Sequence, residues 1–179
     1  MTSKEKRSLI SPDTVMGSVF LVLALVFPVL FHVVHLGSAF LPMFFPIALA
    51  GFLIAPGIAA LVGLLAPLLS SVLTGMPPLY PPIAPLMAVE GLVLAAAIGL
   101  TRKKLEWGVY PSLIVGILLQ RSVMAIAVFF VAPLFRLPGD IFTAGMLISG
   151  IPGIVLQLIA IPPIVIGLEP RMKRLEEIA

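Results

Sequence analysis

Four strongly polar side chains stand inside otherwise apolar stretches of this sequence. They are Glu90, Gln120, Arg121 and Gln157. An ionised carboxylate accepts hydrogen bonds, a guanidinium donates them, and an amide does both. Charged groups in an apolar environment are costly unless they pair with each other or meet a polar partner. Two chemical roles follow: a structural ion pair between Glu90 and Arg121, or a set of contacts to a bound small molecule.

The composition places these residues in a membrane protein. The chain has 179 residues, of which 60% are hydrophobic and 11% charged, and its mean hydropathy is +1.21. A soluble domain usually has about a quarter of its residues charged. There is no cysteine, which excludes disulfides and thiolate metal sites. The formal charge of +3 gives no support for nucleic-acid binding. We therefore expect one integral membrane domain over residues 1–179.

The apolar stretches predict an all-α membrane protein with six transmembrane helices. The uncharged stretch from Phe40 to Leu73 is too long for one helix, since a membrane span needs about 20 residues. Ala55-Pro56-Gly57 is the natural break, because proline and glycine end helices. This break makes the second span short. The predicted spans are about 15–34, 42–54, 57–73, 82–100, 108–132 and 147–168.

The positive charges test the number of spans. With six spans, three basic clusters fall on one side of the membrane, and with five or seven they do not. The positive-inside rule then makes both termini cytoplasmic. The first apolar run exceeds the usual signal-peptide core, so we expect it to be retained. The clusters are Lys4, Lys6 and Arg7; Arg102, Lys103 and Lys104; and Arg171, Lys173 and Arg174.

Depth in the membrane favours a ligand pocket. Counted from the outer ends of their spans, Glu90, Arg121 and Gln157 lie ~12, ~16 and ~15 Å deep at ~1.5 Å per residue. This level is near the middle of a ~30 Å hydrocarbon core. A lone ion pair needs no further donors, whereas a buried ligand uses groups such as Gln120 and Gln157. The ion pair and the pocket remain compatible interpretations.

The outer loops supply further candidates for the pocket. His35 and Phe40 lie in HLGSAFLPMFFP, which also contains Met43, Phe44 and Phe45, residues that can cap an apolar cavity or simply pack in the core. Tyr80 can enter the pocket from the next outer loop, and Met87 lies one turn before Glu90. His32 and His35 have a spacing compatible with a metal, but no third ligand is near, so we predict no metal site.

Catalytic patterns are missing from the sequence. Ser70 and Ser71 lack a GxSxG-like context, and there is no HExxH motif. Glu90 has no second acidic residue within the membrane to form a catalytic pair. We therefore predict that the chain is not an enzyme and holds no cofactor.

One segment resembles a known family. The run LPMFFPIALAGFLIAPGIAALVGLLAPLLSSVLTGMPP, from Leu41 to Pro78, resembles a pattern common in the substrate-binding S-components of energy-coupling factor (ECF) transporters. The resemblance implies a micronutrient pocket near the outer face, formed by spans four to six and capped by two outer loops. It also implies a transmembrane coupling protein and two ATPase subunits as partners, with ATP used by those subunits. The implied location is the cell membrane of a prokaryote.

The first span departs from the family pattern. Many S-components carry an AxxxA motif there, where small side chains let the coupling protein approach closely. The nearest counterpart is Thr14-x-x-x-Ser18, with Gly17 beside it. Small residues at this spacing serve the same packing, so we predict that Thr14, Gly17 and Ser18 dock the coupling subunit.

The ligand and two alternative functions stay open. Arg121 suits a carboxylate or phosphate, and pantothenate, niacin, a pyridoxine or a pyrimidine precursor of thiamine would fit a small vitamin pocket. If Glu90 already neutralises Arg121, a neutral ligand with amine or hydroxyl groups fits better. One alternative is a stand-alone secondary transporter in which the Glu–Arg pair relays protons. The other is a membrane assembly subunit that binds no ligand.

Overall fold

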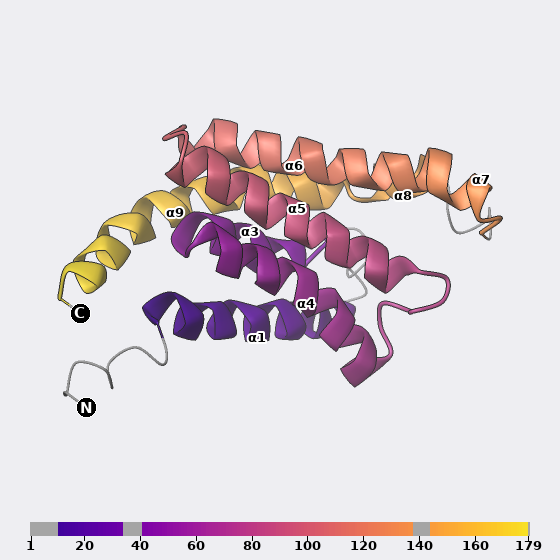
Figure 1. The fold of residues 1–179 in the computed structure, drawn as a ribbon, viewed down its shortest axis with the longest axis horizontal. Coiled ribbons are helices and arrows are strands. Elements are labelled where there is room, and N and C mark those ends of the chain that lie inside the picture. Colours follow the sequence, from indigo (N-terminus) through magenta and orange to yellow (C-terminus); the bar gives the residue numbers. More distant parts are fainter. Residues whose placement is uncertain (1–10, 34–40, 138–143, 179) are drawn as a thin grey trace, which may run out of the picture.

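The computed structural model describes residues 11–33, 41–137 and 144–178, and the described part is helical without a strand (Figure 1). Side chains are described for these ranges except at 32, 33, 144 and 172–178. The helices, in chain order, are α1 (Pro12–Val33), α3 (Phe44–Leu53), α4 (Pro56–Thr74), α5 (Ile83–Lys103), α6 (Val109–Ile126), η2 (Ala127–Val131), α7 (Ala132–Leu134), α8 (Ala144–Ser149) and α9 (Ile151–Ile178).

Five of the six predicted spans correspond to helices long and apolar enough to cross a membrane. They cover Pro12–Phe31, Pro56–Thr74, Ile83–Lys103, Val109–Leu134 and Gly145–Arg171. The second predicted span is helix α3, which has 10 residues. A helix of that length is ~15 Å long and crosses only half of a ~30 Å core. The all-helical prediction is confirmed, but α3 is a half-length, largely buried helix and not a full span.

Local sequence signals set several helix ends. The Ser11 hydroxyl accepts a hydrogen bond from the Thr14 amide at 3.2 Å, and Pro12 opens α1. A side-chain cap followed by proline is a favoured helix start, because proline has no amide hydrogen to leave unpaired. Helix α4 begins at Pro56 and ends at Gly75, which has φ of 73°. Glycine adopts this left-handed conformation without the strain that a Cβ would add.

Helices α4 and α5 pack together more closely than side chains would allow. A Cβ added to Gly63 of α4 would lie 2.2 Å from the carbonyl oxygen of Gly91 of α5. The reverse also holds, because a Cβ on Gly91 would lie 2.5 Å from the carbonyl oxygen of Gly63. Paired small residues of this kind let two membrane helices meet backbone to backbone. This contact fixes where the first half of α5, which carries Glu90, stands relative to α4.

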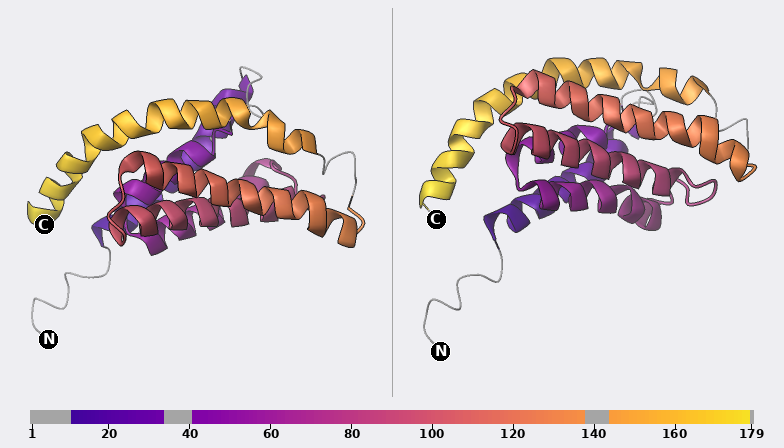
Figure 2. Two further views of the ribbon diagram at one scale, coloured as in Figure 1. Left: turned by 90° about the horizontal axis from the view of Figure 1, so that it is seen from above. Right: turned by 45° about the horizontal axis from the view of Figure 1, so that its top comes forward.

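Helix α9 forms a long curved arm along one side of the bundle (Figure 2). It contains Pro162, Pro163 and Pro170, and proline inside a helix removes a backbone hydrogen bond and bends the axis. The start of α1 and the end of α9 lie at the same end of the molecule (Figure 1).

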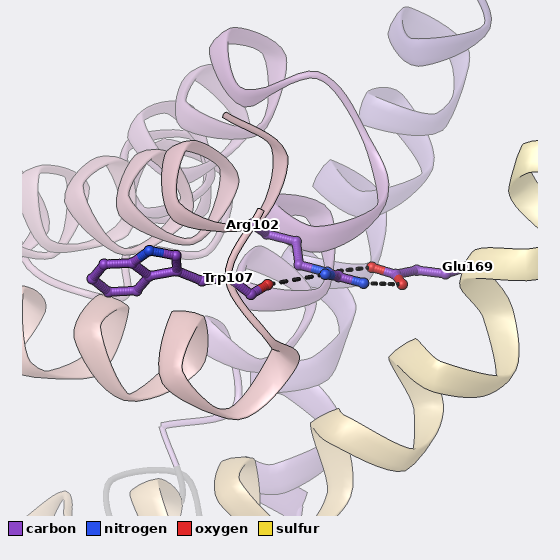
Figure 3. A network of polar contacts seen from close by, with 3 residues as sticks. All are labelled: Arg102, Trp107 and Glu169. Atoms are coloured by element: carbon purple, nitrogen blue, oxygen red, sulfur yellow. Dashed lines mark hydrogen bonds and ion pairs between the residues drawn. The ribbon is translucent and has the colours of Figure 1, made fainter. Parts of the chain in front are cut away.

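At this same end, an ion pair ties α9 to the end of α5 (Figure 3). The Arg102 guanidinium donates to both carboxylate oxygens of Glu169, from Nε at 2.9 Å and from Nη2 at 2.6 Å. Its Nη1 donates to the Trp107 carbonyl at 2.9 Å. Bidentate hydrogen bonds between arginine and a carboxylate are among the stronger polar interactions in proteins. Arg102 therefore joins α5, the turn before α6 and α9.

Replacing Arg102 by glutamine should loosen this end of the bundle. The variant loses both contacts to Glu169, so we expect about 1–3 kcal/mol of destabilisation. For a chain of this size that corresponds to a melting temperature lower by about 2–12 °C. Thermal unfolding in detergent measures the change. Lys103→Gln is the matched control, because Lys103 is exposed in the same helical turn, and equal melting of both variants would contradict the assignment.

Candidate functional site

A cavity of about 770 Å³ opens at the end of the bundle away from Arg102. It is lined by the later parts of α1, α4 and α6 and by the beginnings of α3 and α5, with α8 closing one side. Successive helices run in opposite directions, so these segments share one end of the molecule. The volume falls within the roughly 300–1,000 Å³ of small-molecule sites. The cavity is therefore large enough for a small metabolite.

The resembling segment builds much of this cavity wall. Residues 41–44 line it from the start of α3, and residues 76–78 line it from the connection between α4 and α5. Met43 and Phe44, for which the sequence left a cavity cap and core packing open, line the wall and are also buried in the core. Phe45 stacks on Phe27 of α1 with ring centroids 6.1 Å apart. The connection after α4 holds its place partly because Ser70 donates to the Met76 carbonyl at 2.7 Å.

Two charged side chains reach the cavity, and they are the two singled out by the sequence. Glu90 lies in α5 and has no exposed surface, and Arg121 lies in α6. Within the described part of the chain, neither Glu90 oxygen and none of the three Arg121 side-chain nitrogens has a hydrogen-bond partner. An ion pair is present between Arg102 and Glu169 there, but none joins Glu90 to Arg121. The charges share a cavity without a direct contact.

The break between α8 and α9 makes room for the Arg121 head group. A Cβ on Gly150 would lie 3.0 and 3.1 Å from the two terminal guanidinium nitrogens and 2.9 Å from Leu41 Cδ1. The guanidinium therefore rests against the backbone at the α8–α9 break. Any other residue at position 150 must displace the end of Arg121 or of Leu41. Glycine here positions a charged group at the cavity.

Gly150→Ala should weaken ligand binding while leaving the fold intact. The atoms in its way are the ends of two flexible side chains, so we expect a stability change under about 1 kcal/mol. The guanidinium must move, and charge-assisted hydrogen bonds depend on geometry, so affinity should fall about three- to tenfold. Calorimetric titration with whichever of pantothenate, niacin, pyridoxine and the pyrimidine precursor of thiamine the wild-type protein binds measures this. Gly167→Ala is the control, since nothing lies within 4 Å of its Cβ; equal affinity of the two variants would refute the positioning role.

The other predicted pocket residues have different outcomes. Met87 lines the cavity. Gln120 and Gln157 are buried and do not line the cavity. The Nε2 of Gln120 and both side-chain amide atoms of Gln157 have no hydrogen-bond partner in the described chain. Tyr80 is 79% exposed and lies outside the cavity wall. His35 and Phe40 lie outside the described residues.

The predicted docking residues of α1 separate into two kinds. Thr14 and Ser18 are exposed, and the Ser18 hydroxyl donates to the Thr14 carbonyl at 3.1 Å, so this polar group is satisfied within the helix. Gly17 is buried instead: a Cβ there would lie 2.7 Å from Ile58 of α4. Its small size therefore serves packing inside the chain, and an exposed small surface remains only at Thr14 and Ser18.

Three methionines of the cavity wall were not among the residues that the sequence indicated. They are Met76, Met124 and Met146, which join Met43 and Met87 in the wall. Five of the eight methionines in the chain thus line one cavity. A methionine in an apolar helix has no spacing that separates a cavity wall from an ordinary core. Their gathering becomes visible only when the five segments are brought together in space.

These features define an α-helical membrane protein with a partly charged cavity at one end of its bundle. The sequence from residue 14 to 165 matches the family described as the ECF transporter substrate-specific component, and the chain belongs to that family. No curated protein and no solved structure gives a significant match to it. The resemblance carried by Leu41–Pro78 is thus confirmed over most of the chain.

Proposed function

We propose that this chain binds a small water-soluble vitamin or vitamin precursor at the outer face of a prokaryotic cell membrane and presents it to an ECF transport complex. The observation that carries the proposal is the cavity, in which the buried Glu90 carboxylate and the buried nitrogens of Arg121 have no hydrogen-bond partner among the described residues. Buried polar groups without partners are rare in folded proteins because each costs free energy. A ligand that supplies those partners accounts for their presence at one site.

The implied partners are a transmembrane coupling protein and two ATPase subunits, which would use the ATP. Both termini would then lie in the cytoplasm, on the side of the membrane where the ATPase subunits would act. In this mechanism the chain only has to bind its substrate selectively and release it. The cavity contains two opposite charges that can recognise polar groups of the substrate. Its apolar wall excludes water, which strengthens the contacts that the two charges make with the substrate.

Uptake by whole cells tests whether this chain only binds the substrate while the coupling protein and ATPases drive its transport. Cells that express this chain with a coupling protein and two ATPases should accumulate one radiolabelled compound from a panel of pantothenate, niacin, pyridoxine and the pyrimidine precursor of thiamine. Cells that express this chain alone should bind that compound but not concentrate it. Concentration by the chain alone, abolished by a protonophore, would instead support the stand-alone secondary transporter.

The exposed face of α1 offers a second test. If Thr14 and Ser18 meet the coupling protein closely, the double substitution Thr14→Leu/Ser18→Leu should reduce co-purification of the complex about tenfold or more, since bulky side chains hold helices apart. Ligand binding should not change, because neither residue lines the cavity. The control is Leu118→Phe, an exposed position on α6. Normal complex formation by the double variant would place the docking surface elsewhere.

A further inference from the structure

The hydroxyl groups of the cavity wall already donate their hydrogens to the protein backbone. Ser70 donates to the Met76 carbonyl at 2.7 Å, and Thr74 donates to the Ser70 carbonyl at 2.8 Å. Ser149 donates to the Met146 carbonyl at 3.1 Å. A hydroxyl has one hydrogen to give, so these three groups offer a ligand acceptor positions only. A ligand rich in hydroxyl groups would find few donors here.

Within the described part of the chain, in contrast, the side-chain polar atoms of Glu90 and Arg121 have no hydrogen-bond partner. An ionised Glu90 carboxylate can only accept, and Arg121 can only donate. An anionic ligand that carries no donor group would pair with Arg121 and leave the fully buried Glu90 carboxylate without a partner. A cationic ligand that carries no acceptor group would likewise pair with Glu90 and leave Arg121 without a partner. An unpartnered buried charge is strongly unfavourable, so the best ligand satisfies both groups at once.

The rest of the wall favours a ring. Methionine side chains reach the cavity from five different segments, at Met43, Met76, Met87, Met124 and Met146. Methionine sulfur makes favourable contacts with aromatic rings, and the flexible side chain adapts to their outline. Phe44 is the only aromatic residue in the described wall, so a ring would be held mainly by methionines and less by stacking.

We propose that the ligand is a small zwitterion built on an aromatic or heteroaromatic ring. Its cationic or donor group meets Glu90, its anionic group meets Arg121, and its ring lies among the methionines. Uncharged sugars and other polyols are expected to bind more weakly, because hydrogen bonds between oppositely charged groups are stronger than those to neutral hydroxyls. This inference rests on the proposed function and narrows it, because it assigns a chemical class to the substrate of the same cavity.

Matched ring compounds test the charge requirement. The purified protein in detergent is titrated with 3- and 4-(aminomethyl)benzoate and L-phenylalanine, which carry both charges. It is also titrated with 4-methylbenzoate, 4-methylbenzylamine and 1,4-benzenedimethanol, which carry a negative, a positive and no charge, and with ribitol. The melting temperature reports binding, because a ligand that binds only the folded state stabilises it. At least one zwitterion should bind about ten- to hundredfold more tightly than every other probe, as the loss of one charged hydrogen bond implies.

Two variants assign the charges to their residues. Glu90→Gln should abolish the advantage of the zwitterion over 4-methylbenzoate, and Arg121→Gln should abolish its advantage over 4-methylbenzylamine. Glu106→Gln and Arg171→Gln remove the same charges from exposed positions and should leave the preference unchanged. If neither variant changes the ranking, the two residues do not select the ligand and the inference fails.

Failure of the inference and failure of the proposed function give different results. Tightest binding of the benzoate, the benzylamine, the diol or ribitol would overturn the zwitterion while leaving a ligand-binding subunit. A folded protein that none of the seven probes stabilises, and that releases no small molecule on denaturation, would overturn the proposed function together with the inference. A folded protein that is silent to all seven probes but releases a molecule without both charges would overturn the inference alone.

Discussion

Gly63→Ala is expected to destabilise this protein by about 3 kcal/mol or more, because overpacking against atoms that cannot move is the costly kind. The added Cβ would lie 2.2 Å from the Gly91 carbonyl oxygen, 2.4 Å from its carbonyl carbon and 2.8 Å from the Leu92 nitrogen. All three are backbone atoms of α5, so no side chain can rotate away. The two helices must separate along their contact, and the beginning of α5 moves with them.

Gly57→Ala is the matched control, since it lies on the same helix α4 and nothing is within 4 Å of its Cβ. Size-exclusion chromatography and thermal unfolding in detergent should show a monodisperse protein of wild-type stability for Gly57→Ala. For Gly63→Ala they should show a large loss of folded protein. Equal melting temperatures for the two variants would mean that α4 and α5 do not meet backbone to backbone.

Arg121→Gln should lower ligand affinity by about a hundredfold, the upper range for losing hydrogen bonds to a charged group. The same substitution should leave the ligand-free protein as stable as before or make it more stable. The reason is that the guanidinium is unpartnered in the described structure, and an unpartnered charge in an apolar site destabilises the fold. Functional groups held in place for a ligand commonly reduce stability in this way.

The structural ion pair predicts the opposite pair of results. If Arg121 serves mainly to neutralise Glu90, its removal leaves a buried carboxylate and should cost about 3–5 kcal/mol. Glu90→Gln/Arg121→Gln would then recover the stability. Melting temperature without ligand and calorimetric affinity with it separate the two cases, and Arg171→Gln controls for the loss of an exposed arginine. Loss of stability with unchanged affinity would contradict the pocket assignment.

Depth counting along the spans brings together two residues that share a cavity in the structure. The helix rise alone puts Glu90 and Arg121 at a similar level, and both line the cavity; whether they bind a ligand stays a prediction. The same counting placed Gln157 beside them, but depth says nothing about which side of a helix a residue faces. Gln120 immediately precedes Arg121 in the chain, so its side chain points about 100° around the helix axis from that of Arg121. It is buried and does not line the cavity.

Hydropathy predicted where the helices are, but not how far each one crosses. The apolar run before Ala55 extends beyond α3, yet the helix itself begins only at Phe44, and Leu41, Pro42 and Met43 before it line the cavity. Small residues gave a similar ambiguity. Gly17 fits a surface for another protein and equally a contact with Ile58, and the sequence does not say which neighbour comes close.

Mass spectrometry of the small molecules carried by the purified protein tests the central claim most directly. The wild-type protein is isolated from its cell membrane without added ligand, denatured, and the released compounds are counted per mole of protein. We expect one ring-containing zwitterion close to stoichiometry in the wild type and in Arg171→Gln, and its loss in Arg121→Gln. The same compound at the same occupancy in Arg121→Gln, or a compound without both charges from the wild-type protein, would contradict the account.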